Sequence, residues 1–224
     1  MTHRKRIPGQ LALGALLSIG LASACSKPAT VEPARIAEAT PAEQQRIHAA
    51  ERELDRARDG LGRAQAATEQ AKEFQRTSAE EQQGAESDYA EATRSVERSE
   101  GTRDANLATS IDQRHQAAEL ASEEFNAKAR FADDLVDLRE KEQALAEADV
   151  KLQEALVERA KFDAAEQAGD IEGLERADFV DAEESARIAF GEAQRDIAGA
   201  KQRSDASQKD WLVARNRSLE SGPR

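Results

Sequence analysis

Asp112, His115 and Glu119 come nearest in this chain to the pattern of a metal site. Their spacing of i, i+3 and i+7 places them on one face of a helix, where carboxylate and imidazole groups could share an ion. Di-iron helical bundles, however, use two Glu-x-x-His motifs and two further carboxylates. This chain has a single Asp-x-x-His motif and three histidines in all. We therefore expect a charged helix face with a protonatable histidine, and neither a metal nor another cofactor.

Neighbouring carboxylates are candidates for general acid and base chemistry. The pairs are Glu123 with Glu124, Asp133 with Asp134, and Glu183 with Glu184. Such chemistry requires burial that moves the pKa values of the two groups apart. Because the chain has 44 acidic residues, two neighbouring carboxylates more commonly belong to a solvated helix face than to a catalytic site. The sequence also has neither a glycine-rich phosphate loop nor a Gly-x-Ser-x-Gly motif. We predict no catalytic residues, no enzyme activity and no small-molecule substrate.

Cys25 is the single cysteine of the chain, so no disulfide can form within it. Residues 1–6 carry three positive charges, residues 11–22 form an uncharged and largely apolar run, and small residues precede Cys25. This order is typical of a signal peptide. The apolar run is shorter than the roughly 20 residues that span a membrane. The sequence predicts an exported protein with residues 1–24 as its signal peptide.

The segment Leu21-Ala22-Ser23-Ala24-Cys25 resembles the lipobox of bacterial lipoproteins. The resemblance implies cleavage by signal peptidase II, lipidation of Cys25 and membrane attachment through its acyl chains. Ser26 after the cysteine, in place of Asp, implies the outer membrane, with the protein facing the periplasm. That family prefers Leu where this chain has Ala22. Ala22 and Ala24 also form an Ala-x-Ala site for signal peptidase I, which would release a soluble periplasmic or secreted protein.

The charge balance argues against nucleic-acid binding. The chain carries 32 basic and 44 acidic residues, for a net charge of −12, whereas proteins that bind nucleic acid present a basic surface. The segment Lys201–Arg217 has five bases and two acids, an ordinary excess for the end of a helix.

Residues 25–40 are predicted to be the lipidated cysteine and a flexible tether. The tether contains Pro28 and Pro33. In a polyproline-like form, at about 3.1 Å per residue, residues 26–40 would reach roughly 45 Å. A helix should start directly after it, because Thr40 and Glu43 form a capping box and Pro41 suits the first helical position.

Long helices are predicted for the rest of the chain, because no proline occurs from residue 42 to residue 222. Apolar and small residues recur at heptad spacing in three stretches. The first contains Ile47, Leu54 and Leu61, with Ala50, Ala57, Ala64 and Ala71 interleaved, and continues less clearly through Phe74, Ala85, Tyr89, Ala92 and Val96. The second contains Phe131, Leu138, Leu145 and Leu152, with Leu135 and Leu156. The third contains Phe179, Ala182, Ala186, Phe190, Ala193, Ile197, Ala200, Ser204, Ser207, Trp211 and Ala214.

Two interruptions divide this region, one near residues 101–104 and one at residues 169–173. Gly169 can end a helix in the left-handed conformation, and Asp170 can cap the next helix. We predict an all-α protein with long antiparallel, coiled-coil-like helices near 41–100, 104–168 and 171–219, followed by a tail at 220–224. Leu, Ile, Val and Phe are few and charge is high, so disorder of part of this region stays an alternative.

These features favour a structural role. The expected function is that of a lipid-anchored helical envelope protein that acts as a spacer or scaffold. One alternative is a helical module that docks a partner protein in the periplasm, and another is a secreted coiled coil without an anchor. The expected partners are the membrane, through acyl chains on Cys25, and a protein or a second copy bound along the helix faces.

Overall fold

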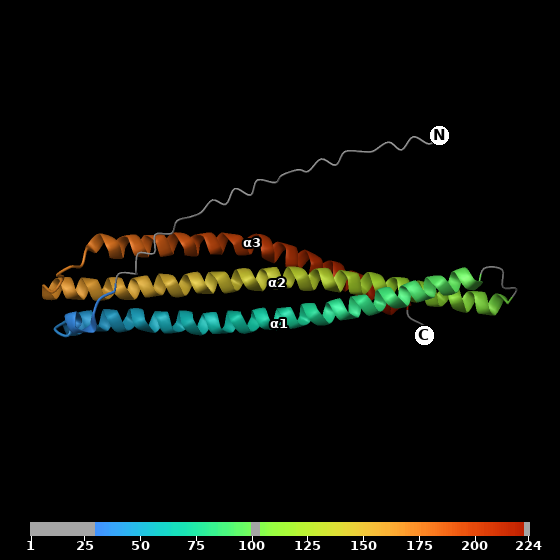
Figure 1. Cartoon of the computed structure of the whole chain (residues 1–224), viewed down its shortest axis with the longest axis horizontal. Helices are drawn as coiled ribbons and strands as arrows, with labels where there is room; N and C mark the ends of the chain where they lie inside the picture. The colour runs from blue at the N-terminus through green and yellow to red at the C-terminus, as the bar shows by residue number, and fades with distance from the viewer. Residues whose placement is uncertain (1–29, 100–103, 222–224) are drawn as a thin grey trace, which may run out of the picture.

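The computed structural model describes residues 30–99 and 104–221, and within these ranges it contains helices and no strand (Figure 1). The helices are η1 (Pro33–Ile36, a 3₁₀ turn), α1 (Pro41–Ser99), α2 (Ala105–Ala168) and α3 (Arg176–Ser221). At 1.5 Å per residue, α1, α2 and α3 are about 88, 96 and 69 Å long. The predicted all-α architecture of long antiparallel helices is confirmed.

Helix α2 lies in the middle, with α1 on one side and α3 on the other (Figure 1). Both neighbours run antiparallel to it. Among the described residues, no Cα atom of α1 comes within 8 Å of a Cα atom of α3. We call the end with residues 30–40 and the α2–α3 loop the base, and the end with Ser99 and Ala105 the tip. Figure 1 shows that α1 and α2 continue beyond the end of α3 toward the tip.

The heptad pattern of α1 packs against α2. The capping box forms as predicted: the Thr40 N–H donates to Glu43 Oε2 (2.6 Å), and the Glu43 N–H donates to Thr40 Oγ1 (3.4 Å). One heptad position holds small side chains along the whole helix, and all of them are buried or half-buried: Ala50, Ala57, Ala64, Ala71, Ser78, Ala85 and Ala92. Small side chains at this position let the two helix backbones approach closely.

Helix α2 is buried from two sides, which explains why its apolar residues do not form a single stripe. The side that faces α3 carries Phe131 and Leu138, both buried. The stacking of Phe131 on Trp211 and the ion pair between Asp137 and Arg203 fix the register of these two helices. Ser204, a small residue of the α3 heptad pattern, is also buried.

The helix ends follow local chemistry. The Asp104 carboxylate caps α2 by accepting hydrogen bonds from the N–H groups of Asn106 (3.0 Å) and Leu107 (3.2 Å). Gly169 ends α2 in the left-handed conformation (φ 79°), as predicted. The prediction that Asp170 caps the next helix is wrong, because α3 begins only at Arg176. The predicted tail also starts too early, since α3 continues to Ser221.

Residues 30–39 form a strap that packs on the base, where a flexible tether was expected. Val31 is 4% exposed and lies in one apolar cluster with Phe162, Ala165 and Phe179. Its N–H donates to Glu158 Oε2 (2.8 Å), and Arg35 Nη1 donates to the Glu172 carbonyl (2.7 Å). Pro33 favours the η1 turn rather than extended chain. The tether expectation therefore fails from Thr30 onward, and its earlier part lies outside the described residues.

Candidate functional surfaces

Cys25, the residue predicted to be lipidated, lies outside the described residues, as does the whole segment that resembles a lipobox. The described chain begins five residues later, at Thr30, beside the base of the bundle. No helix of the described ranges is long and apolar enough to cross a membrane.

Asp112, His115 and Glu119 lie on α2 near the tip and do not converge on a common point. His115 is half-buried against Tyr89 of α1, with ring centroids 5.3 Å apart, and its Nε2 lies 3.3 Å from Thr93 Oγ1. The two carboxylates are exposed. Among the described residues, no three His, Cys, Asp or Glu side chains are placed to hold one ion.

The predicted pairs of neighbouring carboxylates lie along helix surfaces, and no member of a pair is buried. Asp133 accepts a hydrogen bond from Gln75 Nε2 (2.8 Å), and Glu183 pairs with Arg187 (2.5 Å). These contacts place Asp133 in a hydrogen bond between α1 and α2 and Glu183 in an ion pair within α3.

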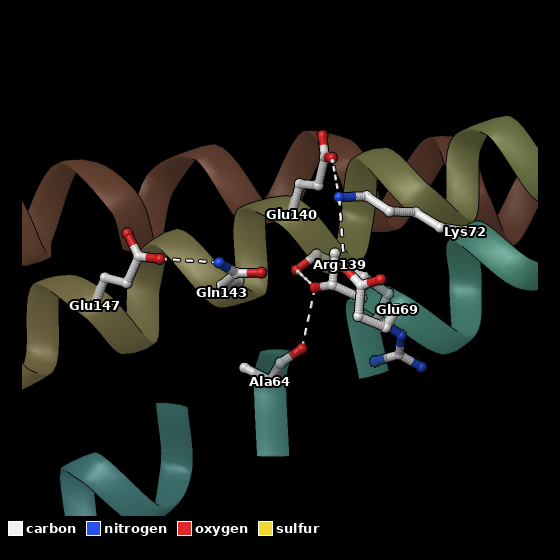
Figure 2. Close-up of polar contacts among 8 residues, drawn as sticks. Ala64, Glu69, Lys72, Arg139, Glu140, Gln143 and Glu147 are labelled. Atoms are coloured by element: carbon white, nitrogen blue, oxygen red, sulfur yellow. Dashed lines mark hydrogen bonds and ion pairs between the residues drawn. The ribbon is translucent and has the colours of Figure 1, made fainter. Parts of the chain in front are cut away.

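Polar side chains join α1 and α2 along their flanks (Figure 2). Lys72 of α1 lies 3.4 Å from Glu140 of α2 and 3.8 Å from Glu69 on its own helix. Beneath them Thr68 is 1% exposed, and its hydroxyl lies 3.0 Å from the Ala64 carbonyl and 3.1 Å from the Arg139 carbonyl. These contacts fix the register of the two helices where the apolar contacts are small.

An aromatic cluster joins all three helices midway along the bundle. Trp211 of α3 stacks on Phe131 of α2 at 5.5 Å, and Phe74 of α1 meets their rings at 6.4 and 5.9 Å. The ammonium group of Lys128 lies 5.4 Å from the centre of the Phe74 ring. The heptad pattern predicts core positions for these three aromatic residues, and their rings pack against one another between the helices.

A groove of about 920 Å³ runs between α1 and α3 near the base. Its apolar lining includes Leu54, Val157, Phe179, Ala182 and Ala186, with Thr30 of the strap at its edge. We call it the base groove. It exists because α1 and α3 both pack on α2 without meeting each other.

The charges around the base groove are mostly acidic on the α1 side. Arg58 pairs with Glu154 (3.2 Å), and Lys161 pairs with Glu158 (2.7 Å), so these four charges neutralise one another. Glu51 and Asp55 on α1 form no ion pair with a Lys or Arg of the described chain. In the base, the Arg176 guanidinium donates hydrogen bonds to the Glu166 carboxylate, which raises the pKa of Arg176 above its usual value.

The C-terminal part of α3 exposes apolar and basic side chains, and two of these residues, Val213 and Arg217, line a hollow shared with α1 and α2. Leu212, Val213 and Leu219 are 42%, 52% and 69% exposed. Lys209, Arg215 and Arg217 are also exposed and form no ion pair within the described ranges. We call these six residues the basic apolar face.

Sequence reasoning missed the strap, the base groove and the exposed apolar residues of the basic apolar face, whose basic residues it interpreted as an ordinary excess at the end of a helix. The strap could have been suspected from Val31 and Ile36, which are apolar in a segment otherwise typical of a tether. The groove carries no local signal, because it arises from the relative placement of three helices. Comparisons of the chain with protein families, with known proteins and with solved structures found no match.

Proposed function

We propose that this protein is a lipid-anchored envelope protein whose helical rod acts as a spacer or scaffold. Signal peptidase II would cleave before Cys25, and the acyl chains would hold the protein in the outer membrane, facing the periplasm. Several acyl chains on one residue give stable attachment where a single chain does not. The support for the anchor is the signal-like N-terminus and its lipobox-like residues.

The packed strap is the observation that carries the spacer role. Thr30 is held at the base, and four residues lie between it and Cys25. The five Cα-to-Cα steps from Cys25 to Thr30 span at most about 18 Å when fully extended. An anchor at Cys25 would therefore keep the base close to the membrane, while α1 and α2 extend about 90 Å from it. A flexible tether would leave the distance between the base and the membrane variable, whereas a packed strap restricts that distance.

Metabolic labelling with palmitate tests the anchor directly. We expect the wild-type chain to take up label and to fractionate with the outer membrane. Cys25→Ala should abolish both, and the matched neighbour change Ser26→Ala should preserve the label. An unlabelled wild-type protein in the soluble periplasmic fraction would show that the Ala-x-Ala site is used, and the lipid anchor would be refuted.

Docking of a partner protein is a second candidate, favoured by the base groove. Photo-crosslinking in cells separates it from a purely mechanical role. A crosslinking residue at Ser185, inside the groove, should capture one discrete protein if the groove is a docking site. The same residue at Gln113, exposed near the tip, serves as the control. Equal and diffuse products from both positions would count against docking at the groove.

A further inference from the structure

The base groove is lined by apolar and small side chains from all three long helices. Leu54, Val157 and Phe179 line it and are themselves buried. Beyond Phe179 the α3 side is lined only by alanine and serine as far as Ala189, so the groove extends over about 15 Å of helix. Its volume of about 920 Å³ falls in the range of roughly 300–1,000 Å³ that is typical of pockets for apolar ligands.

The N-terminal end of the strap lies at this groove. Thr30 lines the groove, and the Val31 N–H donates to Glu158 Oε2 (2.8 Å). Further along the strap, Ala39 packs in a cluster with Ala164, which lies closer to the base on α2. The strap therefore runs from the groove toward the base, and the residues that precede Thr30 join the described chain at the groove.

Cys25 is close enough in the sequence for a group attached to it to enter the groove. The five Cα-to-Cα steps from Cys25 to Thr30 span at most about 18 Å, which exceeds the length of the groove. We propose that one acyl chain of the lipidated Cys25 lies in the base groove, while the remaining chains enter the membrane. The inference rests on the lipid anchor proposed above, and it names the occupant of the groove.

The free energy of such an arrangement favours the groove. The bilayer and the groove are both apolar, so the methylene groups of the chain stay out of water in either place. The short covalent link makes the contact intramolecular, with an effective concentration on the order of millimolar. The chain would also cover exposed lining residues such as Ala182, which removes apolar surface from water.

The charges at the rim of the groove favour an uncharged occupant. Most of them are paired within the chain: Arg58 with Glu154, Lys161 with Glu158, and Glu51 with His48. The two others, Asp55 and Lys151, have opposite signs and form no ion pair within the described ranges. The rim therefore has little net charge with which to select a charged partner, whereas a hydrocarbon chain requires none.

Photo-crosslinking from the lipid tests the proposal in cells that make the full chain. The cells are fed a palmitate analogue that carries a diazirine, are irradiated, and the purified protein is digested for mass spectrometry. We expect the fragment that contains Cys25 to be linked to residues of the groove lining in the segments 51–58, 151–161 or 179–189.

Two variants fill the groove, and a third is the matched control. Ala182→Trp and Ala186→Trp each place a large side chain in the groove, and each should lower the yield of these crosslinks at least about fivefold. Ile188→Trp should leave the yield unchanged, because Ile188 is a 55% exposed residue of α3 that does not line the groove. All three variants should retain the palmitate label, the membrane fraction and the helix content by circular dichroism.

The possible failures are distinguishable. A labelled wild-type chain whose crosslinks reach only lipids or other proteins would overturn the proposed occupant and leave the anchor standing. Equal loss of crosslinks in the Ile188→Trp protein would also overturn it, because the effect would not depend on the groove. A wild-type chain that takes up no label would refute the lipid anchor, and the proposed occupant with it.

Discussion

Two hydroxyl side chains on the same buried face of α1 should respond in opposite ways to removal. Thr68 places its hydroxyl within hydrogen-bond distance of carbonyls on both α1 and α2, whereas Ser78 Oγ is buried and has no hydrogen-bond partner in the described structure. Thr68→Val keeps the shape of the side chain and loses the bond, so it should lower the free energy of unfolding by about 1 kcal/mol.

Ser78→Ala is the matched change, because it removes a hydroxyl that makes no bond. We expect it to leave the free energy of unfolding unchanged or to raise it by up to about 1 kcal/mol. Urea denaturation followed by circular dichroism measures both variants. A Ser78→Ala protein as destabilised as Thr68→Val would mean that packing volume, rather than hydrogen bonding, governs this face.

At the scale of the elements, two glycines show how backbone conformation decides whether a substitution by alanine raises or lowers the free energy of unfolding. Gly169 has φ 79° at the end of α2, where an L side chain is strained. Gly62 lies inside α1, and a Cβ atom added there would meet nothing within 4 Å. Gly169→Ala should lower the free energy of unfolding by about 1 kcal/mol, and Gly62→Ala should raise it by about 0.5–1 kcal/mol. Thermal unfolding of the two variants checks the pair, and a shift in the same direction for both would contradict this account.

The strap is the element whose attachment matters most for the proposed anchor. Val31→Asp places a carboxylate in an apolar cluster and beside Glu158, which accepts the Val31 N–H. We expect amide hydrogen exchange of residues 31–39 to become at least tenfold faster, while exchange in α1 and α2 changes little. Glu32→Ala, an exposed change in the same segment, is the control. Unaltered exchange in the Val31→Asp protein would mean that the strap is held by its other contacts.

At the scale of the whole molecule, the helices could be predicted but their arrangement could not. The proline-free span, the capping box at Thr40 and the left-handed Gly169 locate the helix ends, because these signals are local. The register and the base groove depend on which helix faces which, and small heptad residues such as Ala57 and Ala71 pack against many neighbours equally well. The strap was missed for a related reason, since Val31 is buried only because Phe162 and Phe179 meet at the base.

The aromatic cluster should hold the three helices together as one cooperative unit. No Cα atom of α1 comes within 8 Å of a Cα atom of α3 along the described chain, so the Trp211 side chain links the two helices through Phe74 and Phe131. Trp211→Ala should cost about 3 kcal/mol, and it should free the C-terminal half of α3 to exchange its amide hydrogens before α1 and α2 do. Trp211→Phe preserves an aromatic ring at this site and should cost less than about 1.5 kcal/mol. Residue-resolved hydrogen exchange measures both effects, and uniform loss of protection across all three helices in the alanine variant would show that α3 does not unfold as a separate unit.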